Sequence, residues 1–375
     1  MKEILFAFTR LGCLGFGGPF AAVAMMEEEF VRSRKWLTQS RFAELVAVCK
    51  LLPGPLSTQM AIALGRERAG TQGGMVSGFV FILPAFLAVT LFSVLYSRTG
   101  WVGRYEGFFS GLQAGTFAVI LLSIWQLGKP YIKISRAWVL ALISGVTVLM
   151  APRLEPVAIL MSGVLGVLKH KPPIFFSKSK SKGYKAFTGF LGLGLSGLVL
   201  NSKLLEIFWV CFKAGAFVFG SGIAIVPFLE ADAVVKYHWM SHSEFMDGLV
   251  FGQITPGPVV ITATFIGYQA AGILGAVVAT FGIFLPSFIN VLFIVPRIWG
   301  RWSKGGGAQA FAAWAVPAVG GGVAASMVRL GSMSFHSRLS IFLFLIATTA
   351  LFVKRLPSWL VILACGLASG LFQLR

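Results

Sequence analysis

The sequence contains the same pattern twice. Leu52-Pro53-Gly54-Pro55 returns as Thr255-Pro256-Gly257-Pro258, and around the motifs an offset of 203 also aligns Trp36 with Trp239. After one residue is lost, an offset of 202 aligns Pro84 with Pro286. Because rare residues such as Trp and Pro fall in step with a single gap, we infer an internal duplication rather than a shared apolar composition. Duplicated halves in an apolar chain are typical of secondary transporters, whose substrate lies between the repeats.

The composition places both halves in a membrane. Of the 375 residues, 57% are apolar and only 12% are charged, although the net charge is +19. The Lys and Arg residues lie mainly in short gaps between apolar runs, as the positive-inside rule expects, so the charge does not indicate a nucleic-acid partner. Thirteen apolar runs, among them 41–64 and 243–268, predict an all-α polytopic membrane protein with about 12–13 transmembrane segments.

The chain divides into three parts. Residues 1–168 form an N-terminal transmembrane repeat, 169–203 a basic linker with an extra crossing segment at 186–200, and 204–375 a C-terminal transmembrane repeat. An odd number of segments before the second repeat makes the repeats inverted, provided that 186–200 crosses. The distribution of Lys and Arg predicts a multi-pass protein of the inner (plasma) membrane with a cytoplasmic N-terminus.

Each Pro-Gly-Pro motif predicts a broken helix. Proline cannot continue an incoming helix but suits the first turn of an outgoing one, which leaves the first backbone N–H groups of the outgoing half-helix free. The N-termini of the two outgoing half-helices, with their free N–H groups and positive dipole ends, suit an anion near the membrane midplane. A packing kink is the alternative. The candidate substrate-binding residues at the breaks are Pro53, Gly54, Pro55, Leu56, Ser57, Thr58, Gln59, Gln253, Pro256, Gly257, Pro258, Val259 and Thr262.

Cations within the apolar runs favour an anionic substrate. Arg10 and Lys213 are equivalent under the duplication, and Lys50 lies three residues before Pro53, where the second half has the neutral Gln253. Ionisable residues inside a membrane are costly and usually functional, so we include Arg10, Lys50 and Lys213 in the substrate site. Arg10 could alternatively extend its charge to the membrane surface.

Glycines and acids add two further sets of candidates. Gly17, Gly18, Gly220, Ser221 and Gly222 interrupt the first segment of each half and act as a hinge, a site lining or close helix-packing positions. Glu44 and Asp247 are equivalent and are candidates for proton coupling. Both also lie early in their helices, where acidic residues favour the helix dipole.

No catalytic, metal-binding or cofactor-binding pattern is present in the sequence. The four cysteines are isolated and share no C-x-x-C spacing, and the four histidines lie in loops or at segment ends. We therefore expect no enzyme activity, no metal and no cofactor.

Several motifs resemble those of the chromate ion transporter family in its long, two-domain form. They are Phe16-Gly17-Gly18-Pro19, Glu27-Glu28-Glu29, Trp36-Leu37, Leu52-Pro53-Gly54-Pro55 and Leu83-Pro84, with their second-half counterparts. The resemblance implies a secondary active transporter that exports chromate, or a related divalent oxyanion such as sulfate, by alternating access.

An anion channel, an oxyanion receptor of the same fold and a sulfate importer are the alternatives, and a homodimer is left open. Pro19, where the family often has a third glycine, and the additional Lys50 leave the choice of oxyanion open.

Overall fold

The two halves are built from the same succession of helices. The computed structural model describes residues 1–99, 105–151, 154–170, 202–218, 222–296, 306–335, 337–354 and 356–373, and every regular element in these ranges is a helix. The first half contains α1 (Lys2–Leu14), α2 (Gly18–Glu27), the π-helical η1 (Glu28–Ser33), α3 (Gln39–Leu51), α4 (Leu56–Thr99), α6 (Glu106–Gly128), η2 (Lys129–Tyr131), α7 (Ser135–Met150) and α8 (Glu155–His170). The second half contains α10 (Ser202–Ala216), η4 (Gly222–Ile225), α11 (Val226–Glu230), the π-helical η5 (Ala231–Lys236), α12 (His242–Ile254), η6 (Val259–Ile261), α13 (Thr262–Ile289), η7 (Asn290–Ile294), α15 (Gly307–Ser334), α16 (Arg338–Phe352) and α17 (Ser358–Gln373). The predicted all-α fold is confirmed.

Within the described residues, four helices are long and apolar enough to cross a membrane. They are Leu56–Arg98, Glu106–Tyr131, Val259–Ile294 and Gln309–Ser332, and shorter apolar helices cover Ser135–Met150, Arg338–Phe352 and Ser358–Phe372. The runs 41–64 and 243–268, which the sequence presents as single crossings, are each two short helices that meet at Pro-Gly-Pro. The basic linker and segment 186–200 lie almost entirely outside the described residues, so the number of crossings stays a prediction.

The duplication extends to the backbone angles. Helix α4 is interrupted at Ala69 (φ −146°, ψ 32°) and Gly70 (φ 64°, ψ −156°), and α13 at Ala271 (φ −149°, ψ 32°) and Gly272 (φ 61°, ψ −150°). Only glycine adopts such a positive φ without strain, so each interruption contains one. The chain turns back there into a helical hairpin, and the two hairpins have the same turn.

The hairpins are closed by direct backbone contact. A Cβ added to Gly73 would lie 2.2 Å from the carbonyl oxygen of Gly65, and one added to Gly275 would lie 2.0 Å from that of Gly267. Any side chain at these positions therefore separates the two arms of the hairpin. Small residues at helix contacts serve this purpose in membrane proteins, where close packing replaces the hydrophobic effect.

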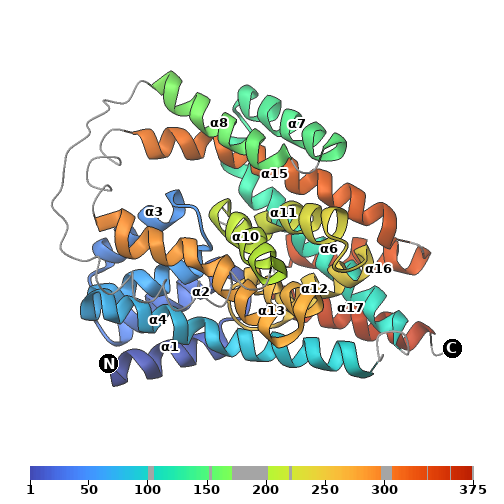
Figure 1. Cartoon of the computed structure of the whole chain (residues 1–375), viewed down its shortest axis with the longest axis horizontal. Coiled ribbons are helices and arrows are strands. Elements are labelled where there is room, and N and C mark those ends of the chain that lie inside the picture. Colours follow the sequence, from blue (N-terminus) through green and yellow to red (C-terminus); the bar gives the residue numbers. More distant parts are fainter. Residues whose placement is uncertain are drawn as a thin grey trace.

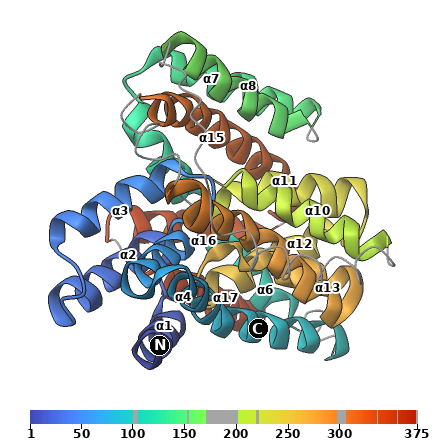
Figure 2. The same cartoon turned by 60° about the vertical axis from the view of Figure 1, so that its left-hand side comes forward.

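The helices after each hairpin pack against the opposite half. Helix α6 contacts α16 and α17, whereas its equivalent α15 contacts α7 and α8. Glycines again permit close approach, since a Cβ on Gly111 would lie 2.2 Å from the carbonyl oxygen of Cys365 and one on Gly321 would lie 2.0 Å from that of Ala141. In both overall views α7, α8 and α15 form one layer (Figures 1 and 2). Each half thus completes its bundle with helices of the other.

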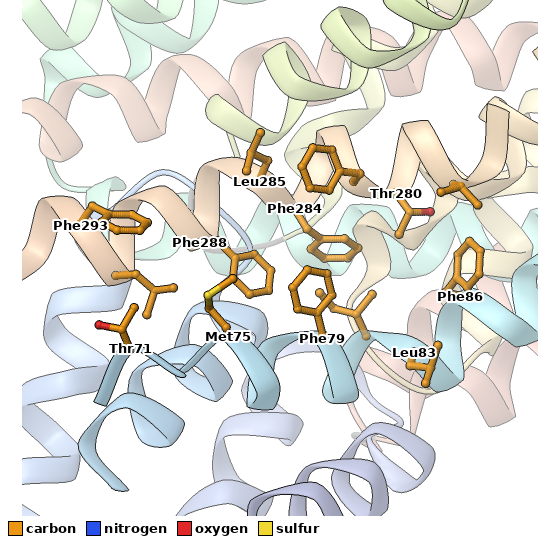
Figure 3. Close-up of a pocket in the computed structure, with 14 residues that line it drawn as sticks. Thr71, Met75, Phe79, Leu83, Phe86, Thr280, Phe284, Leu285, Phe288 and Phe293 are labelled. Carbon is orange, nitrogen blue, oxygen red and sulfur yellow. The ribbon is translucent and has the colours of Figure 1, made fainter. Parts of the chain in front are cut away.

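The second arm of α4 runs antiparallel to α13. Thr71 lies near Phe293 at one end of their contact and Phe86 lies near Thr280 at the other (Figure 3), and the rings of Phe79 and Phe288 are 5.0 Å apart between their centroids. A cavity of about 300 Å³ between these helices is lined almost wholly by apolar side chains from equivalent positions of the two halves. Such walls suit an acyl chain rather than an oxyanion.

We expect Gly275→Ala to destabilise the protein, because its Cβ would meet backbone that cannot move away without opening the hairpin. Overpacking of this kind costs about 1–3 kcal/mol. Gly320→Ala is the matched control, since no atom lies within 4 Å of its added Cβ. Thermal unfolding of the detergent-purified variants, followed by loss of the monodisperse peak, measures the difference. Equal melting temperatures for the two variants would contradict the close contact.

Candidate oxyanion site

The two helix breaks contact each other's half through reciprocal hydrogen bonds. The N–H of Gly54 donates to the carbonyl oxygen of Val218 (2.6 Å), and the N–H of Gly257 donates to that of Gly15 (3.0 Å). Donors and acceptors are both equivalent under the offset of 203. A contact that repeats with its partners exchanged is what a two-fold axis produces. The breaks therefore lie at the pseudo-symmetric interface of the two halves, against the C-terminal ends of α1 and α10.

A cavity of about 110 Å³ lies beside the second break. Its walls come from several elements that are distant in sequence. They consist of Gly17, Gly18, Pro19 and Phe20 at the start of α2; Val119, Leu122, Ser123 and Gln126 on α6; Gly222 and Ile223; Gly252, Gln253, Thr255, Gly257 and Val259 around the break; and Ser358.

Three helices begin at the wall of this cavity. They are α2 at Gly18, the η6–α13 helix at Val259 and α17 at Ser358. The first N–H groups of a helix have no partner within it, and each N-terminus carries about half a positive charge. None of the described wall residues is acidic. Three helix N-termini in the wall, with no acidic residue among the described wall residues, favour an anion over a cation.

Side-chain amides are the main polar groups of the walls. The hydroxyls of Ser123 and Thr255 donate to carbonyl oxygens of their own helices, at 3.0 Å to Val119 and 2.8 Å to Phe251. The amides of Gln126 and Gln253 and the hydroxyl of Ser358 thus supply the side-chain donors beside the helix N-termini.

The first break is more tightly filled. The side-chain amides of Gln59 and Asn290 both donate to the carbonyl oxygen of Pro53, at 2.7 and 2.6 Å. A Cβ on Gly54 would lie 2.5 Å from the hydroxyl oxygen of Ser287. The hydroxyls of Thr58 and Ser287 and the carbonyl of the Gln59 amide are buried without a hydrogen-bond partner. This break therefore has polar atoms in place for a ligand or water but less open space.

The structure pairs two of the candidate cations with acids. Arg10 lies 3.6 Å from Glu29, and its equivalent Lys213 forms an ion pair with Asp232, the equivalent of Glu29. In each half, a π-helix (η1 or η5) carries the acid that pairs with the cation of the first helix. The ammonium of Lys50 instead lies 5.9 Å from the centre of the Phe20 ring, which itself lines the cavity. Of these three cations, only Lys50 is thus placed near the cavity.

The equivalent acids Glu44 and Asp247 have different environments. Glu44 is exposed and its carboxylate accepts from Arg41 at 2.6 Å. Asp247 is buried, and its two oxygens accept from Tyr96 (3.0 Å) and from the Gln113 amide (2.8 Å). Asp247 therefore links α12 to α4 and α6, whereas Glu44 has a surface partner.

The remaining candidates lie in and around the breaks. Pro55, Leu56, Ser57, Pro258 and Thr262 are buried, and Pro53 and Pro256 are partly buried. The hydroxyl of Thr262 donates to the carbonyl oxygen of Val259 (3.0 Å) within its own helix. The amide of Ile261 is also occupied, since it donates to Pro258 (3.0 Å). Gly220 and Ser221 lie outside the described residues.

Sequence reasoning missed the contribution of α6 and α17 to the cavity. Ser123, Gln126 and Ser358 carry no charge and lie far from either Pro-Gly-Pro motif. A usable signal was present, because an offset of 203, one residue more than the offset of 202 at Pro84, aligns Ser123 with Ser326 and Gln126 with Arg329 and so marks this face of α6 and α15. Buried Glu155, Glu230 and Arg329 were missed as well.

Comparisons with known proteins agree on one family. A family model described as chromate transporter matches residues 2–167 and again 205–370. A probable chromate transport protein of Synechococcus elongatus is 32% identical over 99% of this chain and 95% of its own length. The chromate transport proteins of Cupriavidus metallidurans and Pseudomonas aeruginosa are 36% and 33% identical, over 79% and 78% of this chain and 74% and 73% of their own lengths. No solved structure gives a significant match.

We predict that Gln126→Glu abolishes oxyanion binding, because it places a carboxylate in the wall of the cavity. Like charges about 4 Å apart repel by about 4 kcal/mol at an effective dielectric constant of 20, which corresponds to a loss of affinity of at least about a hundredfold. Calorimetric titration of the purified protein with chromate measures the change. Gln269→Glu makes the same substitution where the side chain accepts from Ser97 outside the cavity, and should bind normally. Unchanged affinity in Gln126→Glu would exclude this cavity as the site.

Proposed function

The chain belongs to the chromate transporter family, and we propose that it exports chromate, or a related divalent oxyanion, from the cytoplasm by alternating access. The cavity at the second break is the observation that carries this proposal. Three helix N-termini, two side-chain amides and no described carboxylate surround it, so its walls offer hydrogen-bond donors to an oxyanion. The relatives called chromate transport proteins support the choice of anion.

The position of the cavity supports alternating access. Its walls include both the Gly-rich turn of the first half and the break of the second, so movement of one half against the other changes its access. The reciprocal hydrogen bonds of Gly54 and Gly257 join the two halves, and in this proposal one half rotates against the other about these contacts. Gly17 and Gly18 have φ values of 100° and 81°, and they are the hinge between α1 and α2 in this proposal.

The inverted arrangement of the repeats is part of the same proposal. The second arms of α4 and α13 are equivalent and lie antiparallel along their contact (Figure 3). They belong to Leu56–Arg98 and Val259–Ile294, which are long and apolar enough to span a membrane. Because equivalent helices run in opposite directions, they support an arrangement in which the two halves enter the bilayer from opposite sides. We place the protein in the inner membrane with the N-terminus in the cytoplasm, as the basic gaps between apolar runs predict.

We predict that Pro258→Ala reduces chromate efflux by about tenfold or more, although no charged group is changed. Without proline a helix can run through the break, which pairs the free amides and turns their dipole away from the cavity. Thr262→Val is the matched control. Its hydroxyl already donates to Val259 inside the helix, so its loss costs about 1 kcal/mol and leaves the cavity wall intact. Proteoliposomes loaded with chromate or sulfate, at matched protein levels, give both fluxes.

Two results would count against this function. If chromate efflux falls no more in Pro258→Ala than in Thr262→Val, the Pro-Gly-Pro motif is only a kink that serves helix packing. A channel would be indicated if chromate flux does not saturate as the chromate concentration rises and is not inhibited by chromate on the other side of the membrane.

The inverted arrangement predicts that the two hairpin turns face opposite sides. Thr71 and Ile273 are equivalent, exposed and next to the glycines of the turns. Single cysteines at these positions, in a Cys13→Ala background that removes the exposed native thiol, should react with an impermeant maleimide from opposite sides of right-side-out vesicles. Reaction of both cysteines from the same side would mean that the repeats are parallel.

A further inference from the structure

The pseudo-symmetry assigns the cavity beside the second break a set of counterpart positions in the other half, and two of these positions carry charged residues. In α6, α8, α15 and α17 the offset is 203 again, because a Cβ on Gly163 would lie 2.3 Å from the ring of Phe311 and one on Gly366 would lie 3.0 Å from that of Phe108. At this offset Ser123 of the cavity wall aligns with Ser326, Gln126 with Arg329 and Ser358 with Glu155. The neutral residues that surround the cavity are thus replaced by an arginine and a glutamate in the other half. This difference indicates that the counterpart has a different ligand.

Glu155 is a buried carboxyl group without a partner. Its side chain has no exposed surface, and neither of its oxygens has a hydrogen-bond partner in the part of the chain that the structure describes. It begins α8 and faces α15, where a Cβ on Gly322 would lie 2.2 Å from one of its oxygens. The hydroxyl of Ser326, one turn along α15 from Gly322, is also buried and without a partner. An ionised carboxylate in such surroundings is costly, so the geometry favours the protonated form.

The cations around Glu155 already have partners. Arg329 of α15 makes two contacts with the buried carboxylate of Glu230 on α11, at 2.9 and 2.8 Å. Lys213 of α10 is paired with Asp232 of η5, and His242 at the start of α12 lies 3.5 Å from Glu230. Among the described residues, and with His242 neutral, Arg329 and Lys213 balance the carboxylates of Glu230 and Asp232, so an ionised Glu155 would add one uncompensated negative charge.

We propose that Glu155 is a proton-binding site whose proton exchanges against the oxyanion. Glu155 lies within electrostatic range of Glu230, Arg329 and Lys213. When its proton leaves, the new carboxylate competes with Glu230 for Arg329, and the contacts between α8, α11 and α15 change. These helices belong to both halves, so loss of the proton acts on the interface that the transport cycle moves. The proton passes from water on one side of the membrane to the carboxylate and from there to water on the other side.

This inference rests on the proposed oxyanion transport and is tested by measuring protons and chromate together. In proteoliposomes, each pH unit of gradient should shift the equilibrium chromate ratio by about tenfold per proton exchanged. A trapped pH-sensitive dye should report proton movement when a chromate gradient is imposed. Glu155→Gln keeps the shape of the side chain but cannot lose a proton. We expect it to bind chromate normally while its chromate ratio no longer responds to pH.

Two further variants make the result specific. Glu155→Asp retains a titratable group and should restore the pH response. Glu44→Gln removes an exposed acid that is paired with Arg41 and should leave the response unchanged. Proton exchange of wild-type magnitude in Glu155→Gln would overturn the proposal. So would chromate transport by the wild-type protein without proton movement, which decides the question even where Glu155→Gln does not fold. Absence of any chromate binding or flux in the wild type would instead contradict the proposed function itself.

Discussion

The structure depends on how the backbone groups at two helix breaks are satisfied away from water. An unpaired N–H in a bilayer costs several kcal/mol, so irregular backbone is tolerated there only where protein or a water-filled cavity covers it. The amide of Gly54 has its partner at the end of α10, and the amide of Gly257 has its partner at the end of α1. Neither of these two glycine amides has its partner within its own half. The need for these bonds holds the halves together at the place where the proposed anion site lies.

The two halves also depend on each other through close contacts between their helices. Helix α6 completes a bundle with α16 and α17, and α15 completes one with α7 and α8. Gly111 and Gly321 allow backbone contact at these crossings. Because the cavity beside the second break takes walls from α6 and from the start of α17, the exchange of helices is also what assembles the proposed site.

The sequence predicted those features that depend on local chemistry. Proline and glycine indicated the broken helices, and the aligned Trp, Pro and Gly residues indicated the duplication, which the angles at Gly70 and Gly272 show in the backbone. Pairing across the fold could not be predicted in the same way. Arg10 and Lys213 look like unpaired intramembrane cations until the π-helices bring Glu29 and Asp232 to them. Ser358 has no feature that marks it as part of a site until α17 begins beside the second break.

Differences between the halves matter for function because the fold itself is so nearly symmetric. Two identical half-sites would bind the same ligand with the same affinity, and exchanging the halves would leave the energy of the transporter unchanged. The chain departs from symmetry at the equivalent pairs Gln126 and Arg329, and Ser358 and Glu155. One member of each pair surrounds a cavity with neutral donors, and the other is part of a buried charged cluster. A ligand can shift a conformational equilibrium only by its difference in affinity between the states. Placing an oxyanion in one half-site and a proton in the other gives the two ligands separate influence over the same interface, which is the condition for coupling one flux to the other.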